Sequence, residues 1–375
     1  MTLRIKDIFP DHGIKAEKKC TQSTLAFAPL EPYSANPLIR ELMGLNGAQL
    51  LFRPKILPQH LLKAKEWQFW EKIKHITKIK TPSGKKVYDG IQLIARPDDP
   101  IRPAVEFINA NAKKMEISFI DLNFCCPGYK VLPQKRGGEL LKTPDLVIKV
   151  ISRVLKYSDL PISMKIRKGY TQDDNPIELC RRIRKEFGKN IGWISLNRAP
   201  VKMAGVNMQH IQNDLSSFQE AYEAVEGVIP ILANGGISDV CQLQNIVQNT
   251  NVSGIMIGRA AMGNSRIFYK ASQFFQPNLL AKDWTIEQEL QNLFLLVNKY
   301  KRGPSGRWVS IGNLKRILFF YIKAFYERRS QQIPKGYGFS KWNQTSFSKE
   351  SLIATLINIF PSIPKLTWQH WLAFL

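Results

Sequence analysis

The residues best suited to chemistry lie at the end of one apolar segment. The run from Ile117 to Phe124 is typical of a buried strand, and Pro127-Gly128 ends it abruptly. Asn123 and Cys126 therefore lie where a strand turns into a loop. A thiol at such a position can donate a proton or act as a nucleophile. A small buried cysteine beside a turn is the structural alternative, because free cysteine packs like an apolar side chain.

Other strand ends carry groups that suit an anionic cofactor. Asn234-Gly235-Gly236 and Gly258-Arg259 each follow an apolar run, and small residues let backbone amides approach a phosphate closely. Lys165 and Arg167 share one side of a further run, because side chains alternate along a strand. An ordinary turn and a pair of solvated cations are the structural alternatives. Two glycine sites at the last two strand ends favour phosphate binding.

The elements that must position these residues repeat along the chain as short apolar runs. The runs are Leu25–Ala28, Ala48–Phe52, Ile91–Ala95, Ile117–Phe124, Ile162–Ile166, Trp193–Leu196, Ile229–Ala233 and Gly254–Ile257. Gln92 is a polar exception in the third run, and its buried side chain would need hydrogen-bond partners, which the amide edge of a planar heterocycle could supply. Helix-like segments such as 145–157 and 176–187 fill the gaps. We therefore predict an α/β fold, a (β/α)8 TIM barrel, with a doubly wound open sheet as the alternative.

The pattern changes to helices after about Pro277. Segments Thr285–Tyr300 and Ile311–Tyr326 have the apolar faces of helices, and the first begins with a capping threonine. We predict a barrel domain over residues 1–275 and a helical domain over residues 276–375.

The balance of charge indicates a polyanionic partner. Lys and Arg number 54 against 30 Asp and Glu, a net charge of +24. This excess favours nucleic acid first and a membrane surface second. Residues 54–89 mix lysines with aromatic side chains, which suits a surface that meets nucleic acid, although a helix and a solvated hairpin would explain them equally. A lysine-rich surface without a partner is the remaining alternative.

The cysteines and the apolar runs exclude several classes of protein. The five cysteines are irregularly spaced and include no Cys-x-x-Cys pair, so we expect no structural metal and no disulfide framework. No apolar run reaches the ~18 residues of a membrane span, and the first residues lack the apolar core of a signal peptide. These features predict a cytoplasmic protein that does not cross a membrane.

Several of these residues belong to an ordered set of motifs. The motifs are Ala28-Pro29-Leu30, Gln92-Leu93, Asp121-Leu122-Asn123-Phe124-Cys125-Cys126-Pro127, Gly138-Glu139-Leu140-Leu141, Lys165-Ile166-Arg167, Asn234-Gly235-Gly236 and Gly258-Arg259. In order and spacing they resemble the motifs of the tRNA-dihydrouridine synthase family, over a stretch from residue 24 to residue 330. Each motif is modest alone, and the ordered set is fairly specific.

The resemblance implies an enzyme that reduces uridines of tRNA to 5,6-dihydrouridine. It implies FMN at the barrel mouth, NADPH or NADH as the reductant, and hydride transfer from flavin N5 to C6 of the uracil. Cys126 would protonate C5, because it precedes proline as the family's cysteine does. The resemblance also implies tRNA as the partner, and we expect a monomer.

The resemblance also implies roles for individual residues. Cofactor contacts are implied for Ala28, Pro29, Leu30, Gln92, Lys165, Asn234, Gly235, Gly236, Gly258 and Arg259. Substrate contacts are implied for Asn123, Arg167 and Arg198, of which Asn123 would hold the uracil. Lys165 and Gln92 would lie near the flavin ring, where a cation stabilises the anionic reduced form.

The chain departs from the family pattern at several positions. Cys125 stands where the family has glycine, and Leu30 stands where it has methionine. Leu196-Asn197-Arg198 replaces His-Gly-Arg, which would remove a cofactor contact at Leu196. Arg53-Pro54-Lys55 replaces Thr-Glu-Met, and we expect these cations on a loop beside the substrate, where they would favour phosphate. The alternatives are a tRNA-binding barrel protein that has lost catalysis and an FMN-dependent oxidoreductase of a small molecule.

Overall fold

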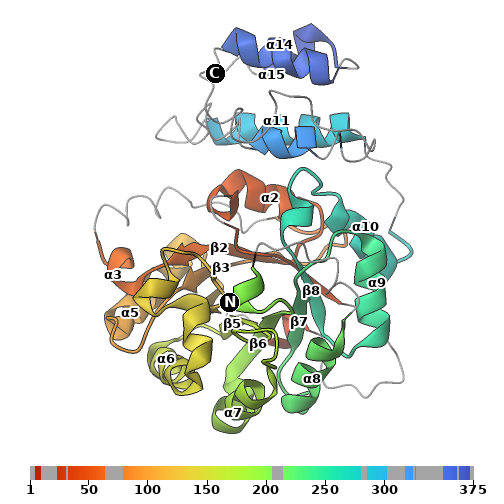
Figure 1. Cartoon of the computed structure of the whole chain (residues 1–375). Helices are drawn as coiled ribbons and strands as arrows, with labels where there is room; N and C mark the ends of the chain where they lie inside the picture. Colours follow the sequence, from red (N-terminus) through yellow and green to blue (C-terminus); the bar gives the residue numbers. More distant parts are fainter. Residues whose placement is uncertain are drawn as a thin grey trace. The chain divides into compact units, whose positions relative to one another are not determined.

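The chain folds into a barrel of strands and helices and a helical region, as the computed structural model shows (Figure 1). The described residues are 5–9, 23–30, 33–63, 79–204, 214–279, 285–301, 317–323, 326, 349–360 and 363–371. Much of the basic segment 54–89 and of the predicted helix 311–326 lies outside the described residues.

A closed barrel of parallel strands forms the first part of the chain, and the strands pair in chain order. They are β1 (Thr24–Phe27), β2 (Leu50–Ile56), β3 (Tyr88–Leu93), β4 (Phe119–Phe124), β5 (Ile162–Arg167), β6 (Ile191–Asn197), β7 (Ile231–Asn234) and β8 (Gly254–Ile257). The pairing of Thr24 with Gly254 is part of the β1–β8 contact that closes the barrel. The predicted (β/α)8 TIM barrel is confirmed, and each predicted apolar run overlaps one strand.

Helices connect successive strands, and those after β3 lie around the outside of the barrel (Figure 1). Among the described residues, the α-helices as far as the end of the barrel are α1 (Ile5–Ile8), α2 (Pro37–Leu45), α3 (Pro58–Leu61), α5 (Ile101–Met115), α6 (Pro144–Tyr157), α7 (Ile177–Phe187), α8 (Ser216–Ala224), α9 (Val240–Asn249) and α10 (Ile267–Phe275). Local sequence sets their ends. Asn36 caps α2 by accepting a hydrogen bond from the Leu38 amide at 3.0 Å. Asp239 caps α9 in the same way by accepting one from the Gln242 amide at 2.9 Å.

The amino-terminal half of the barrel interior is apolar. Phe119 lies between Phe52 and Trp193, with ring centroids 5.2 and 4.8 Å apart. Gly90 on β3 makes room for this cluster, because a Cβ there would collide with the ring of Phe119. Phe9, which follows α1, packs on Trp193 at 5.8 Å and closes this end of the barrel. The main apolar core of the barrel therefore lies at this end, and the side chains nearer the carboxyl ends of the strands can be polar.

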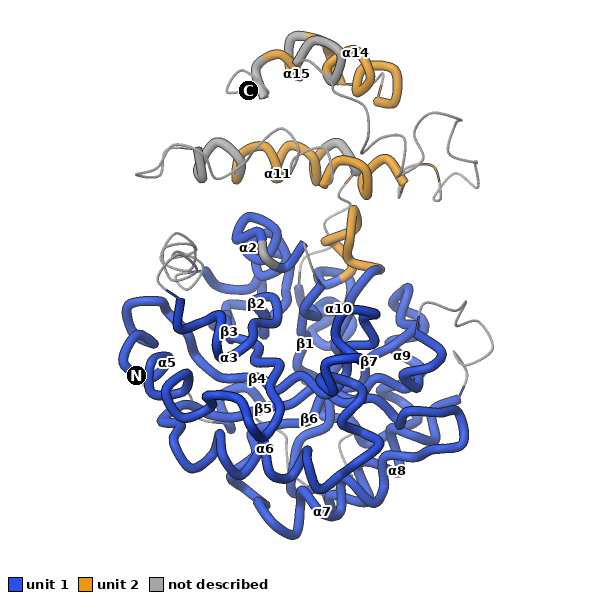
Figure 2. The backbone as a smooth tube through the Cα atoms, turned by 60° about the vertical axis from the view of Figure 1, so that its left-hand side comes forward, with its two compact units in different colours: residues 1–259, 268–279 blue, residues 260–267, 280–375 orange. Residues whose placement is uncertain are grey.

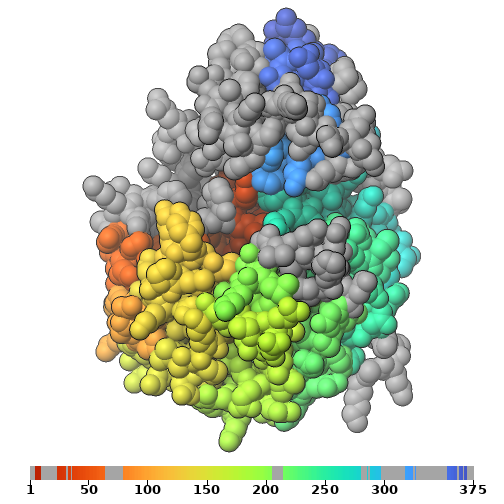
Figure 3. Space-filling model, in the orientation of Figure 1, coloured from red at the N-terminus to blue at the C-terminus, as the bar shows by residue number. Residues whose placement is uncertain are grey.

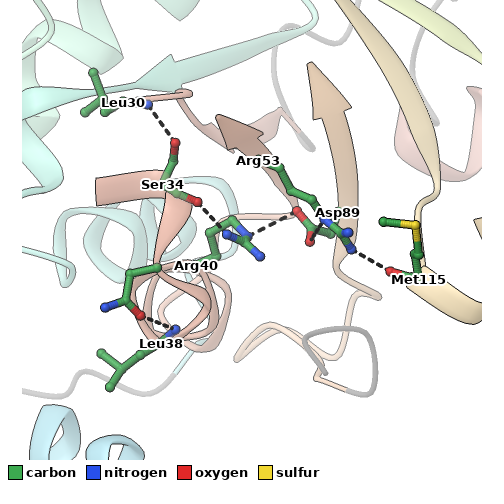
Figure 4. Close-up of polar contacts among 8 residues, drawn as sticks. Leu30, Ser34, Leu38, Arg40, Arg53, Asp89 and Met115 are labelled. Carbon is green, nitrogen blue, oxygen red and sulfur yellow. Dashed lines mark hydrogen bonds and ion pairs between the residues drawn. The ribbon is translucent and has the colours of Figure 1, made fainter. Parts of the chain in front are cut away.

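The expectation of a cationic loop after β2 is wrong for Arg53. β2 continues to Ile56, so Arg53 is a strand residue, and its side chain is buried on the outer side of the strand (Figure 4). The guanidinium donates from Nε to Asp89 Oδ2 at 2.9 Å and from Nη2 to the carbonyl of Met115 at 2.6 Å. Arg40 of α2 shares the same carboxylate, with its Nε 3.4 Å from Oδ1. Arg53 thus joins a strand to its neighbours and does not meet a phosphate.

The chain divides into two compact units (Figure 2). The first contains residues 1–259 and 268–279, and the second contains residues 260–267 and 280–375. The described helices of the second unit include α11 (Ile286–Lys301), α14 (Lys349–Ile359) and α15 (Lys365–Trp371), so the predicted helical C-terminal region is present. Residues 260–267 join this unit partly because the Ser265 hydroxyl and the Arg266 amide donate to Glu289, at 3.1 and 2.9 Å.

Candidate active site

The strand end at β4 holds two neighbouring cysteines in different environments. The Asn123 side chain folds back along the chain, and its Oδ1 accepts hydrogen bonds from the amides of Cys125 at 3.0 Å and Cys126 at 2.9 Å. This local bond replaces the strand ladder where β4 ends. Cys125 is only 4% exposed, whereas Cys126 is partly exposed. Of the two thiols, that of Cys126 is therefore the more accessible from the barrel mouth.

A directed chain of hydrogen bonds crosses the barrel interior below the cysteines. Gln92 donates from Nε2 to Asp121 Oδ2 at 2.7 Å, and Asn123 donates from Nδ2 to Gln92 Oε1 at 2.8 Å. Ser163 donates to the other oxygen of Asp121 at 2.7 Å. An ionised carboxylate only accepts hydrogen bonds, so Asp121 fixes the orientation of both amides and directs Asn123 Oδ1 at the cysteine backbone.

Asp121 and Lys165 are buried titratable groups in this interior. Burial raises the pKa of Asp121 to about 6, although the hydrogen bonds from Gln92 and Ser163 and the charge of Lys165 act to lower that pKa. Burial also lowers the pKa of Lys165, whose Nζ donates to Asn234 Oδ1 and lies 3.4 Å from the sulfur of Met256. A buried amine of this kind favours an anionic or electron-rich neighbour. Sequence reasoning singled out Lys165 but not Asp121, although a carboxylate inside an apolar run was a usable signal.

The two arginines that were predicted to contact substrate are bound to backbone carbonyls. Arg167 donates from Nε to the carbonyl of Cys125 at 2.7 Å and from Nη1 to that of Ala199 at 2.9 Å, which ties the loops after β4 and β6 together. Arg198 donates from Nε to the carbonyl of Gly235 at 2.8 Å, and its guanidinium lies 5.7 Å from the ring centroid of Phe218. Both side chains are buried. Their substrate contacts stay predictions.

At the end of β6, the side chain of Asn197 joins the polar interior of the barrel, whereas that of Leu196 does not. Leu196 is fully buried, and side chains alternate along the strand, so Leu196 and Asn197 point in opposite directions. Asn197 donates from Nδ2 to Asn234 Oδ1 at 3.1 Å, and its Oδ1 accepts from the amide of Ala199 at 3.0 Å. The loss of a cofactor contact that the resemblance implies at Leu196 stays a prediction. Sequence reasoning missed Asn197 because the predicted apolar run ended at Leu196, one residue before the end of β6.

The glycine after β8 lies beside residues that follow β1, and those after β7 have an unusual backbone conformation. Gly235 and Gly236 have φ angles of 101° and 69°, in the left-handed region that favours glycine. A Cβ on Gly258 would lie 3.6 Å from the Cβ of Ala28 and 3.8 Å from a methyl of Leu30. The first and last strands thus bring these predicted cofactor residues together, and Arg259 follows them with an exposed side chain.

Within the described residues, no group of three or more His, Cys, Asp or Glu side chains could hold a metal ion. No described helix combines the length and apolar composition needed to cross a membrane.

Curated relatives match slightly less than half of the chain. The chain is 30% identical over 185 residues to tRNA-dihydrouridine synthase B of Pasteurella multocida, which covers 46% of this chain and 52% of the relative. It is 31% identical over 163 residues to a probable tRNA-dihydrouridine synthase of Aquifex aeolicus, covering 42% and 48%. The enzyme named tRNA-dihydrouridine synthase B from Escherichia coli is 28% identical over 155 residues, covering 41% and 46%. The chain spans about half the length of these relatives.

The family profile described as "Dihydrouridine synthase (Dus)" matches residues 28–333, which is most of the chain. The match includes every strand end described above and extends into the helical region. The polar interior at Lys165, the glycines after β7 and β8 and the cysteine after β4 all lie within it. The chain therefore belongs to the dihydrouridine synthase family.

Proposed function

We propose that the protein reduces uridines of tRNA to 5,6-dihydrouridine, with FMN as cofactor and NADPH or NADH as the reductant. The observation that carries the proposal is the placement of Cys126. Its thiol is partly exposed at the carboxyl end of β4, beside a polar barrel interior that contains Lys165. Membership of the dihydrouridine synthase family supports the same activity.

The residues at the barrel mouth fit FMN. A phosphate would meet the backbone at Gly235 and Gly236 and the cation of Arg259, because glycines let backbone amides approach an anion closely. An electron-rich ring edge would meet the buried ammonium of Lys165. Gly258, beside Ala28 and Leu30, keeps this part of the mouth free of a Cβ. When bound and reduced, FMN supplies the hydride that adds to C6 of the uracil.

Cys126 supplies the proton that the reaction requires at C5. Hydride addition at C6 leaves negative charge on the C5 side of the ring, which an acid must quench. An unperturbed thiol has a pKa of about 8.5, so it is mostly protonated at neutral pH. Cys125 is a poorer candidate because its side chain is buried and its carbonyl is held by Arg167.

Asn123 holds both the cysteine segment and the base. Its Oδ1 already accepts from the amides of Cys125 and Cys126, and one hydrogen of Nδ2 is given to Gln92. A side-chain amide has two hydrogens on nitrogen, so the second can be donated to a uracil carbonyl. The bonds that fix Asn123 hold this donor in place before the base arrives, which lowers the cost of binding.

The tRNA substrate agrees with the charge of the chain. A net charge of +24 suits a polyanion and would make binding fall steeply with salt. Of the features that favoured a protein without catalysis, Arg53 has a structural role in the barrel wall, where it donates to Asp89.

Three measurements on the purified protein test the proposal. The protein should absorb in the flavin region, and its NADPH- or NADH-reduced flavin should be reoxidised anaerobically by unmodified tRNA. Nucleoside analysis of that tRNA should then show dihydrouridine. A flavoprotein that tRNA does not reoxidise would instead act on a small molecule, and a colourless protein that binds tRNA would be a relative without catalysis.

A further inference from the structure

The segment after β4 is a built loop and not an irregular connection. The cysteine loop, defined here as residues 126–138, is closed at its base by a hydrogen bond from the Gly138 amide to the Cys126 carbonyl at 3.0 Å. Gly137 has a φ of 59°, and a Cβ there would lie 2.9 Å from the Cys126 carbonyl oxygen. Gly128 lies on the other side of the cysteine, where a Cβ would be 3.4 Å from its sulfur. The loop therefore encloses Cys126 closely and leaves little room for other conformations.

A buried ion pair fastens this loop to the segment after β3. Both carboxylate oxygens of Asp99 accept hydrogen bonds from Arg136, one of them from Nη2 at 2.6 Å. Both side chains are buried, and Asp99 Oδ2 also accepts from the Arg96 amide at 2.9 Å. Paired bonds between a guanidinium and a carboxylate fix orientation as well as distance. The loop is thus anchored at a second point near its end.

The anchored loop carries an exposed aromatic ring at its tip. Tyr129 and Lys130 are the central residues of a turn that the Val131 amide closes on the Gly128 carbonyl at 2.8 Å. Tyr129 is 80% exposed, the highest value among the exposed large apolar side chains in the described part of the chain. Lys130 Nζ lies 5.6 Å from the centroid of its ring. The loop is internally bonded, so the ring is held out in water rather than left there by a loose chain.

The carboxyl end of the barrel, where this ring lies, also carries several lysines. Exposed Lys130 and Lys135 belong to the cysteine loop, while Lys168 and exposed Lys202 follow β5 and β6. Figure 3 shows the yellow part of the chain, which includes the cysteine loop, on the surface of the face in view. An aromatic ring among cations suits a single-stranded nucleic acid, because cations neutralise phosphates while the ring offers a stacking surface.

We propose that Tyr129 stacks on a base of the tRNA that neighbours the uridine held at Cys126. This inference rests on the proposed function. Tyr129 lies three positions after Cys126 in the chain, and three steps of fully extended chain span at most ~11 Å. The two residues therefore lie within reach of adjacent nucleotides. A uridine drawn out of its stack leaves its neighbour without a stacking partner, and an aromatic side chain can replace that partner.

Binding of an unmodified tRNA transcript at several salt concentrations tests this assignment. Tyr129→Ala should weaken binding by about 5- to 100-fold at every salt concentration, the range for the loss of one base–aromatic stack. The slope of log K against log salt should stay that of wild type, because stacking releases no counterions. Tyr129→Phe should bind as wild type does. Lys130→Ala should instead reduce the magnitude of the salt slope by about 1, the contribution of one phosphate contact.

Tyr157 is the matched control, since it lies at the end of α6, near the opposite end of the barrel, with Lys156 Nζ 5.5 Å from its ring centroid. Tyr157→Ala should leave tRNA binding unchanged. All variants should keep the flavin content and the rate of flavin reduction by NADPH. A Tyr129→Ala protein that binds tRNA normally, or that changes the salt slope, overturns the stacking assignment. A wild-type protein that neither binds nor is reoxidised by tRNA overturns the proposed function itself.

Discussion

Asp89 is the buried anion on which two arginines of the barrel wall depend (Figure 4). Arg53 donates to one of its oxygens at 2.9 Å, and the Nε of Arg40 lies 3.4 Å from the other. All three side chains are at most 2% exposed. Asp89→Asn keeps the size of the side chain but removes its charge, so that two buried guanidinium groups face a neutral amide.

The expected loss of stability is large. Removing one partner of a buried ion pair costs about 3–5 kcal/mol, because the remaining charge is left without compensation. Here one carboxylate serves two cations, so we expect about 4–5 kcal/mol, the upper part of that range. The effect should also reach the segment after β1, since Arg40 donates to the Ser34 carbonyl and the Ser34 hydroxyl accepts from the Leu30 amide at 3.0 Å.

Urea unfolding followed by circular dichroism measures this loss. Asp145→Asn is the matched control, because Asp145 pairs with Arg182 at 2.7 Å while the two side chains are 70% and 30% exposed. That variant should unfold as wild type does, since solvent screens an exposed pair. If Asp89→Asn and Asp145→Asn lost similar stability, the buried carboxylate would not hold the barrel wall as the geometry indicates.

Three further outcomes are expected. Gly90→Ala should lower the free energy of unfolding by about 1–3 kcal/mol or more, because its Cβ would overlap the Phe119 ring, and unchanged urea unfolding would contradict the packing. The folded state binds the Asp121 proton more tightly than the unfolded chain, so this group destabilises the fold increasingly as pH rises from about 4 to about 6. The stability of Asp121→Asn relative to wild type should therefore rise by about 3 kcal/mol between acidic pH and pH 7. If the stabilities of the two proteins changed with pH in the same way, the burial argument would be refuted. Arg259→Ala should weaken FMN binding about tenfold or more in a fluorescence titration. An FMN affinity equal to that of wild type would show that the phosphate of FMN does not bind at Arg259.

The barrel could be predicted from sequence because its signal is strong and local. Parallel strands covered on both faces need nearly continuous apolar runs, and the runs stand out between helical gaps. Closure then brings distant strand ends together without further information. Ala28 and Gly258 lie far apart in the chain, yet a Cβ on the glycine would be 3.6 Å from that of the alanine.

Contacts that depend on a partner distant in sequence could not be predicted in the same way. Arg-Pro-Lys is unusual for a buried strand, and Arg53 becomes acceptable only because Asp89 neutralises it. The apolar run predicted for β6 ended at Leu196, so the polar side chain of Asn197, which lies on the other side of the strand, was missed. The carboxylate of Asp121 stood out in its apolar run, but its role depends on the amides of Gln92 and Asn123, which the sequence does not show as its partners.

The role of Cys126 is tested most directly by single-turnover reoxidation of the reduced flavin with unmodified tRNA. Cys126→Ala should keep FMN, flavin reduction by NADPH and tRNA binding, yet be reoxidised by tRNA at least ~100-fold more slowly, the lower end of what a positioned acid contributes. Cys125→Ala should lose far less, because that thiol is buried beside the accessible one. A slow Cys125→Ala with a fast Cys126→Ala would reverse the assignment, and two fast variants would contradict proton transfer from a cysteine.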